Sequence, residues 1–226
     1  MDSAPTLLRK AIMIPARGET AKILAVNGSP RKDGNTAAML KEILKIAERE
    51  GAQSTYIDLS EMHIHDCKAC MKCKKGESCP QKDDMDVVRP LILEADILML
   101  GSPVYMGDET GQMKCFIDRL YGFLGPTNVP GKYESKLRDD KRAIALFTCQ
   151  MAEGDKLYNY IAVRYFNLLI NMLGYQDIRT FIIGGTIPGV DIRESQRAKT
   201  VLEESERFLK MAIGHPKMQK LEMHLP

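Results

Sequence analysis

The chain has 226 residues, and its 44% hydrophobic content is enough for the core of one α/β domain with short extensions. A formal net charge of +2 gives no electrostatic reason to expect nucleic acid or an anionic membrane as a partner. No apolar run is long enough to span a membrane, and Met1–Lys10 lacks the apolar core of a signal peptide. We therefore expect a cytoplasmic protein, in which clustered cysteines favour a metal or redox site over disulfides.

Short apolar runs, separated by segments with helical periodicity, predict buried strands. The expected strands are Lys22–Asn27, Thr55–Leu59, Asp96–Gly101, Ala143–Cys149 and Ile178–Gly184. One helix is expected after the loop that ends at Thr36, with Gly51 as its stop. Further helices are expected from Asp83 or Asp84 to Glu94, at Gly111–Leu124, at Asp155–Leu173, and from a capping box of Asp191 and Glu194 to Gly214. This alternation predicts a parallel sheet with helices on both faces. Ligands of such sheets bind at the carboxyl ends of the strands.

The domain organisation is expected to be simple. Residues 1–20 form an N-terminal extension, residues 21–214 form the domain, and residues 215–226 form a C-terminal tail. Gly125–Asp140 is long and polar, which predicts a surface excursion. A cysteine-rich loop at 67–80 is inserted after the second strand, and it therefore lies at the carboxyl edge of the sheet.

Four of the six cysteines lie in that loop, with the spacing Cys-x2-Cys-x2-Cys-x5-Cys-Pro. They are Cys67, Cys70, Cys73 and Cys79. Thiolates are soft ligands that both iron-sulfur clusters and zinc accept. Three cysteines at two-residue gaps favour a [4Fe-4S] cluster, because structural zinc more often uses two separated Cys-x-x-Cys pairs. Zinc or no metal is the alternative.

Five lysines lie around the cysteines: Lys68, Lys72, Lys74, Lys75 and Lys82. They form either an ordinary solvated loop or a docking surface for an acidic electron donor such as ferredoxin. His63 and His65 precede the loop, and we interpret them as surface histidines. The alternative is that one of them replaces a thiolate ligand or donates a hydrogen bond to a sulfur.

The loop Gly28–Thr36 follows the first strand and is rich in Gly, Ser, Asn and Thr. Backbone N–H groups and hydroxyls at the start of a helix favour a phosphate group. The loop contains neither a Walker motif nor a Gly-x-Gly-x-x-Gly fingerprint, so an ordinary strand-to-helix turn is the alternative.

This loop, from Asn27 to Thr36, resembles the FMN-phosphate loop of the NADPH-dependent FMN reductase family, which has a flavodoxin-like fold. Gly101–Gly107, followed by Gln112–Leu120, resembles the flavin-ring loop and the next helix of that family. The cysteine spacing resembles the compact motif of the iron-sulfur flavoproteins, a branch of the same superfamily. The resemblance implies a doubly wound five-stranded parallel sheet of order 2-1-3-4-5 and an FMN cofactor.

The resemblance also implies which residues bind FMN. Those expected at the phosphate are Ser29, Arg31, Asn35 and Thr36. Those expected at the flavin ring are Pro103, Val104, Tyr105, Met106 and Gly107. Relatives often have Trp at the position of Met106, and a thioether would pack differently against the ring.

Together these features predict an electron-transfer oxidoreductase that passes electrons between a ferredoxin-like donor, a [4Fe-4S] cluster and FMN. Because the cofactors carry the chemistry, we expect no essential acid or base side chain. One alternative is an NAD(P)H-dependent FMN or quinone reductase without a cluster. Another is a non-catalytic binding or assembly protein. The apolar surface of Asp155–Leu173 predicts a homodimer or homotetramer, as is usual in flavodoxin-like reductases.

Overall fold

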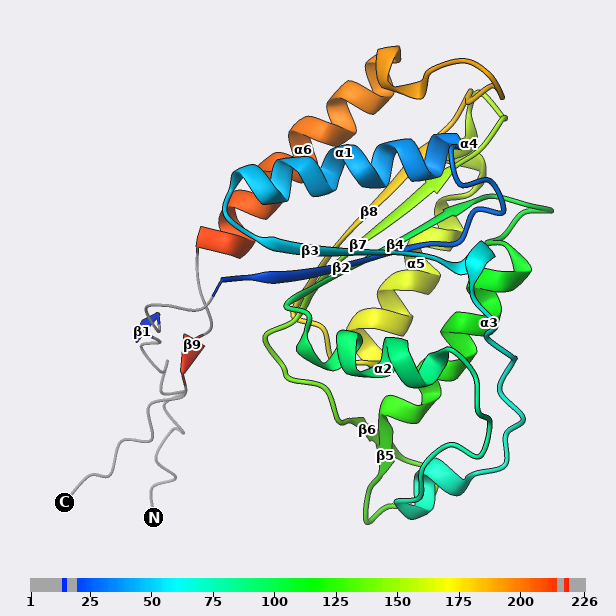
Figure 1. The fold of residues 1–226 in the computed structure, drawn as a ribbon, viewed down its shortest axis with the longest axis vertical. Helices are drawn as coiled ribbons and strands as arrows, with labels where there is room; N and C mark the ends of the chain where they lie inside the picture. The colour runs from blue at the N-terminus through cyan, green and yellow to red at the C-terminus, as the bar shows by residue number, and fades with distance from the viewer. Residues whose placement is uncertain (1–13, 16–19, 215–217, 220–226) are drawn as a thin grey trace, which may run out of the picture.

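A five-stranded parallel sheet forms the centre of the computed structural model, which describes residues 14–15, 20–214 and 218–219 (Figure 1). Its strands are β2 (Lys22–Asn27), β3 (Gln53–Asp58), β4 (Ile97–Pro103), β7 (Arg142–Thr148) and β8 (Asp177–Ile183). The order is β3-β2-β4-β7-β8, and all neighbours are parallel. Counted along the chain this is 2-1-3-4-5, so the predicted flavodoxin-like sheet is confirmed.

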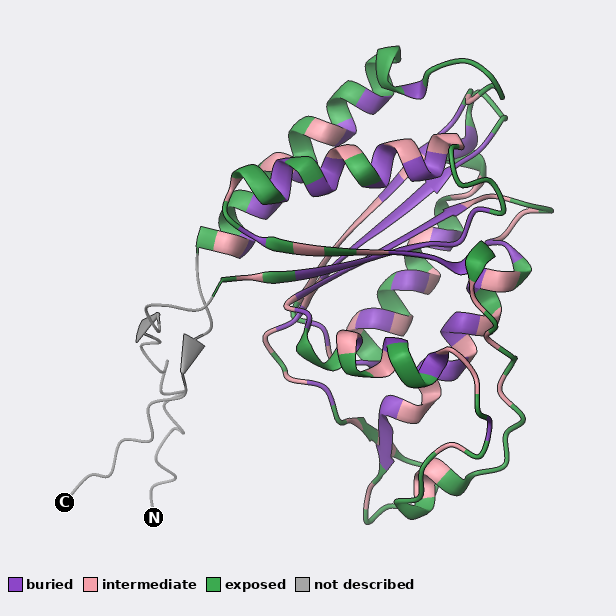
Figure 2. Ribbon diagram, in the orientation of Figure 1, coloured by how far each residue is buried: buried purple, intermediate pink, exposed green. Residues whose placement is uncertain are grey.

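Helices cover both faces of the sheet (Figure 1). On one face lie α1 (Asn35–Arg49) and α6 (Gln196–Gly214). On the other lie α2 (Met85–Glu94), α3 (Gly111–Arg119) and α5 (Asn159–Phe166). Successive side chains of β2 point to opposite faces of the sheet. Ile23 therefore packs against the side of α1 and α6, and Leu24 packs against the side of α2, α3 and α5. Figure 2 shows that the inner strands β2, β4 and β7 are largely buried, that the edge strands β3 and β8 are partly exposed, and that the helices bury the sides that face the sheet.

The segment after α3 differs from the prediction. The helix ends at Arg119, a 3₁₀ turn covers Leu120–Phe123, and a short strand β5 (Leu124–Pro126) follows. This strand pairs antiparallel with β6 (Tyr133–Ser135), so the expected polar excursion contains a small hairpin.

The fourth predicted helix is divided. It consists of α4 (Gly154–Leu157), α5 and a π-helical segment at Asn167–Met172. The predicted capping box of the last helix is wrong, because Asp191 instead caps a 3₁₀ turn at Ile192–Glu194. Ser195 caps α6, since its Oγ accepts a hydrogen bond of 3.1 Å from the backbone N–H of Ala198.

The remaining regular elements are short. 3₁₀ turns lie at Leu59–Glu61 and Lys72–Lys75, and β1 (Ile14–Pro15) pairs antiparallel with β9 (Met218–Gln219). Most of the expected extension 1–20 and tail 215–226 lies outside the described residues. Within the described ranges, no helix has the length and apolar character needed to cross a membrane.

Candidate functional site

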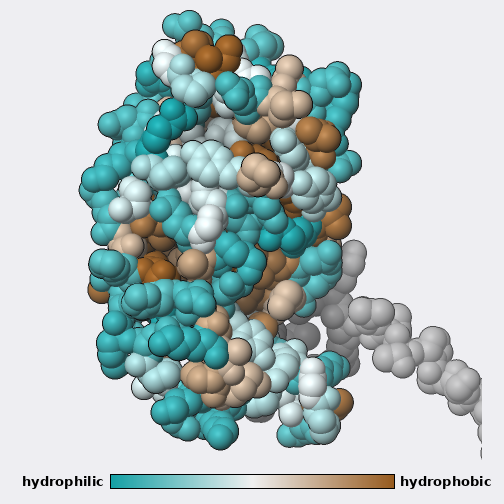
Figure 3. Space-filling view, turned by 90° about the vertical axis from the view of Figure 1, so that its right-hand side faces the viewer, coloured by the Kyte–Doolittle hydropathy of each residue, from teal (hydrophilic) through white to brown (hydrophobic). Residues whose placement is uncertain are grey.

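The loops that follow β2 and β4 are joined at the carboxyl edge of the sheet, which faces the viewer in Figure 3. The carbonyl oxygen of Gly28 accepts hydrogen bonds from Thr110 Oγ1 (2.6 Å) and Gln112 Nε2 (2.8 Å). The N–H of Gly28 donates to the carbonyl of Gly101 (2.7 Å). A Cβ on Gly28 would lie 2.8 Å from Met113 Cβ, so only glycine allows this approach. The two loops predicted to bind FMN are therefore in direct contact.

The four residues predicted at the phosphate lie together but in different environments. Ser29 is buried, and its Oγ accepts a hydrogen bond from the N–H of Arg31 (3.1 Å). The hydroxyl of Thr36 is also buried and shares a hydrogen bond of 2.7 Å with Thr148 of β7. Arg31 is exposed, and Asn35 is the first residue of α1. The start of a fifteen-residue helix thus faces this loop, which favours an anion.

An open cleft of about 550 Å³ borders the start of α1, and three of its lining residues are basic: Arg31, Lys32 and Arg193. Asp191 also lines it and forms an ion pair with Arg193. Hydrogen bonds from the Arg193 side chain and backbone lower the pKa of Asp191 from 3.8 to about 2. Asp33 lines the cleft as well, so three basic and two acidic side chains border it, a net charge of +1 beside the predicted phosphate loop.

The loop predicted to border the flavin ring is a tight turn. Tyr105 and Asp108 exchange backbone hydrogen bonds of 2.7 and 3.1 Å. Met106 and Gly107 occupy the left-handed region, with φ of 50° and 91°. Tyr105 is 47% exposed and Met106 is fully exposed, while Pro103, Val104 and Gly107 are partly buried. The turn therefore presents both large side chains outward at the edge of the sheet.

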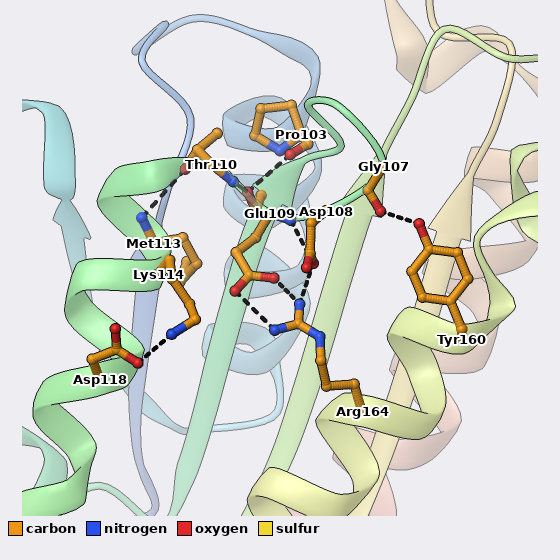
Figure 4. Close-up of polar contacts among 11 residues, drawn as sticks. Pro103, Gly107, Asp108, Glu109, Thr110, Met113, Lys114, Asp118, Tyr160 and Arg164 are labelled. Carbon is orange, nitrogen blue, oxygen red and sulfur yellow. Dashed lines mark hydrogen bonds and ion pairs between the residues drawn. The ribbon is translucent and has the colours of Figure 1, made fainter.

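Arg164 of α5 fastens this turn (Figure 4). Its Nη1 donates to Glu109 Oε1 (3.0 Å), and its Nη2 forms ion pairs with Asp108 and Glu109. Tyr160, also on α5, donates its hydroxyl proton to the carbonyl of Gly107. The carboxylate of Glu109 is only 1% exposed. We did not predict this clamp, although the adjacent acids Asp108 and Glu109 after the ring loop were a visible signal.

All four clustered cysteines line one pocket, and none of them forms a disulfide. Ala69 and Met71, between the cysteines, have left-handed φ values of 50° and 60°, so the loop coils tightly. Gln81 also lines the pocket, and its buried Oε1 has no hydrogen-bond partner among the described residues. Four free thiols around one space are the donor set that an iron-sulfur cluster takes, and the residues present therefore fit such a group.

A site for a single metal ion has less support. Among the residues that the structure describes, no three His, Cys, Asp or Glu side chains are positioned to hold a metal ion. His63 and His65 are exposed, in agreement with the surface interpretation. Cys149 is buried at the end of β7, and burial raises the pKa of its thiol. Cys115 is half-buried on α3, outside the cysteine pocket.

Lys74 has a different role from the lysines around it. Its Nζ lies 3.5 Å from the centre of the Tyr121 ring and donates to the carbonyl of Leu124 (2.6 Å). Burial lowers the pKa of this ammonium group. Lys74 therefore attaches the cysteine loop to the β5–β6 hairpin. The four lysines that remain exposed around the cysteines are Lys68, Lys72, Lys75 and Lys82.

The sheet order and the loops at its carboxyl edge define a flavodoxin-like protein, and solved structures agree. An NAD(P)H:quinone oxidoreductase from Methanothermobacter marburgensis is similar with a TM-score of 0.64, at 17% identity, over 85% of this chain and 98% of that chain. An FMN-dependent NADH-azoreductase from Bacillus anthracis has a TM-score of 0.62 at 15% identity, over 86% and 100% of the two chains. At these identities the likeness concerns the fold alone.

Sequence comparison gives the family. A family model described as NADPH-dependent FMN reductase matches residues 21–157. An iron-sulfur flavoprotein of Archaeoglobus fulgidus is 39% identical over 50% of this chain and 51% of its own length. One from Methanocaldococcus jannaschii is 38% identical over 43% of this chain and 51% of its own length. The chain therefore belongs to the NADPH-dependent FMN reductase family, and the relatives that match about half of it are named iron-sulfur flavoproteins.

These matches are partial. The chain spans about half the length of the first curated relatives that it matches. A more distant relative, a putative NAD(P)H-dependent FMN-containing oxidoreductase of Bacillus subtilis, is 24% identical over 84% of this chain and 97% of its own length.

Proposed function

We propose that this protein is an FMN-dependent oxidoreductase that transfers electrons between a donor such as ferredoxin, a [4Fe-4S] cluster and FMN. The observation that carries the proposal is the single pocket lined by four free thiols, which adjoins the C-terminal end of α3, the helix whose first turn contacts the FMN-type loops. The family match and the names of the relatives support it. When bound, the cluster supplies one-electron chemistry and FMN supplies one- or two-electron chemistry.

In this proposal the chain's residues bind and orient FMN. Ser29, Arg31 and Asn35 hold the phosphate together with the N–H groups at the start of α1. Thr36 contributes through its backbone, because its hydroxyl is engaged with Thr148. The ring lies against Pro103–Gly107, where Tyr105 and Met106 are exposed. No acid or base side chain is required.

We also propose that the partner is an acidic redox protein and that the protein acts in the cytoplasm. The exposed lysines around the cysteine pocket support electrostatic docking of such a donor.

A homodimer or homotetramer is a further part of the proposal. Exposed apolar residues lie on α4 and α5: Leu157, Tyr160, Val163 and Phe166. Tyr165 belongs to the core and does not contribute to this surface. Light scattering of the full chain checks the assembly, and a monomeric mass would contradict it.

The alternative is an NAD(P)H-dependent FMN or quinone reductase without a cluster. The near full-length match to the Bacillus subtilis protein favours it. The thiols would then be structural or bind zinc.

Anaerobic purification with iron, sulfide and FMN analysis separates the two functions. We expect one FMN and about four iron atoms per chain, given the ferredoxin-type ligand set. Cys70→Ser should lose iron, whereas Cys115→Ser, outside the pocket, should retain it. If the anaerobic wild-type protein contains flavin but no iron or sulfide, the cluster proposal is wrong and the reductase without a cluster is the function that stands. Failure to retain added FMN would leave a non-catalytic protein.

A further inference from the structure

The last residue of α3 places a buried cation beside the cysteine pocket. Arg119 lines the pocket, and its side chain is only 2% exposed. Its Nη2 donates to Cys79 Sγ at 3.5 Å, and its Nη1 donates to the carbonyl of His65 at 3.0 Å. A guanidinium has no acceptor function, so its contact with a sulfur is always that of a donor.

The orientation of this guanidinium does not depend on Cys79. Asp83, whose side chain is 1% exposed, pairs with both Nη atoms, with one contact of 3.2 Å between Nη2 and Oδ1. Asp83 is itself held, because Oδ2 accepts from the N–H of His65 (3.0 Å) and Oδ1 from that of Met85 (3.2 Å). One N–H of Arg119 is thus aimed at Cys79 by contacts with other residues.

The other end of α3 belongs to the loops predicted to bind FMN. Thr110 caps the helix and donates to the carbonyl of Gly28, so it ties α3 to the phosphate loop. The nine residues from Gly111 to Arg119 make a rod of about 13 Å. The helix therefore sets the position of Arg119, and through it of Cys79, relative to the flavin loops.

We propose that Arg119 is a positioning residue of the cysteine centre, which donates a hydrogen bond to Cys79 when this thiolate ligates the cluster and thereby raises the cluster's reduction potential. This inference rests on the cluster assignment of the proposed function. A hydrogen bond to a ligand sulfur and a nearby positive charge both stabilise the reduced form, because they offset its additional negative charge. Lys74 cannot substitute, because its ammonium is directed to the Tyr121 ring and to backbone carbonyls.

The test compares midpoint potentials of the cluster in anaerobically purified full-length variants. Arg119→Met alone would leave Asp83 buried without its partner, so the informative variant is the double change Arg119→Met with Asp83→Leu, which removes both buried charges. Arg119→Lys keeps the charge but lacks the fork that contacts Asp83 and Cys79 together. Arg138→Lys is the matched control, since Arg138 pairs with Asp96 and does not line the pocket.

We expect a more negative cluster potential in the double variant, a smaller shift in Arg119→Lys, and none in Arg138→Lys. Iron release to a chelator should be roughly tenfold faster in the double variant, the factor expected for loss of one hydrogen bond to a charged group. The FMN potential should be unchanged in all three.

If the double variant has the same cluster potential and the same rate of iron release as the wild type, the inference is overturned and the proposed function is unaffected. If the double variant does not fold, the Arg119→Lys potential decides, and an unchanged value overturns the inference. Wild-type protein without iron and sulfide would overturn the cluster assignment and this inference together.

Discussion

Two loops are each held by an arginine from a helix on the same face of the sheet. The flavin-ring loop is held by Arg164 of α5, and the cysteine loop by Arg119 of α3. The two ion pairs differ in their exposure to solvent. Arg119 and Asp83 are 2% and 1% exposed, whereas Arg164 is 35% and Asp108 is 51% exposed.

Because of this difference in exposure, the contact between Arg119 and Asp83 is fixed, whereas the contact between Arg164 and Asp108 can be exchanged. An ion pair that water cannot reach has no substitute partner, so removal of one member leaves an uncompensated buried charge. The exposed arm of the Arg164 clamp can exchange Asp108 for water at little cost. The cysteine loop is therefore rigidly placed, while the ring loop keeps one buried contact through Glu109 and one contact that solvent can replace.

The largest expected effect is on stability at the buried pair. Asp83→Ala should lower the free energy of unfolding by about 3–5 kcal/mol, because Arg119 would remain buried and unpaired. Asp108→Ala should cost only about 0–1 kcal/mol, because its partner keeps Glu109 and is partly hydrated. Urea denaturation of both variants as purified measures the difference, and equal losses would remove the distinction between the two loops.

A smaller effect is expected on flavin affinity at the ring loop. Glu109→Gln keeps the shape of the side chain but removes the buried charge that Arg164 contacts. The turn at 105–109 should loosen, and FMN binding should weaken roughly tenfold, which corresponds to about 1.4 kcal/mol. Fluorescence titration of flavin-free protein with FMN measures this. The matched variant Asp108→Asn should weaken binding less, and a larger loss there would reverse the proposed order of the two contacts.

Sequence patterns predicted the features that depend on residues close together in the chain. Continuous apolar runs indicated all five strands of the sheet, and the spacing of four cysteines indicated that they would share one place. The loop after β2 and the loop after β4 were expected at one edge, because parallel strands end there. That both meet at the Gly28 carbonyl could not be inferred, since it depends on the packing of Met113 against a glycine.

The two arginines were missed for a physical reason. Arg119 contacts an acid 36 positions earlier, and Arg164 contacts one 55 positions earlier. Local periodicity carries no information on such pairs, because the register of α3 and α5 against the sheet decides which side chains meet. The burial of Tyr165 was missed for a related reason: only tertiary packing distinguishes it from the exposed Phe166 beside it.

A third arginine pair, on the surface beside the predicted phosphate loop, gives the smallest expected effect. The pKa of Asp191 is about 2 instead of 3.8, chiefly because Arg193 donates hydrogen bonds to it. A carboxyl group with a lowered folded-state pKa adds stability above its unfolded pKa and loses it as the pH falls through the folded value. The melting temperature of Asp191→Asn should therefore be slightly below that of the wild type at pH 6, and the difference should disappear between about pH 4 and pH 2. Thermal unfolding followed by circular dichroism measures it, with Asp33→Asn, at another acid that lines the cleft, as the comparison. A difference that persists at pH 2 would show that Asp191 stabilises the loop by its shape rather than by its charge.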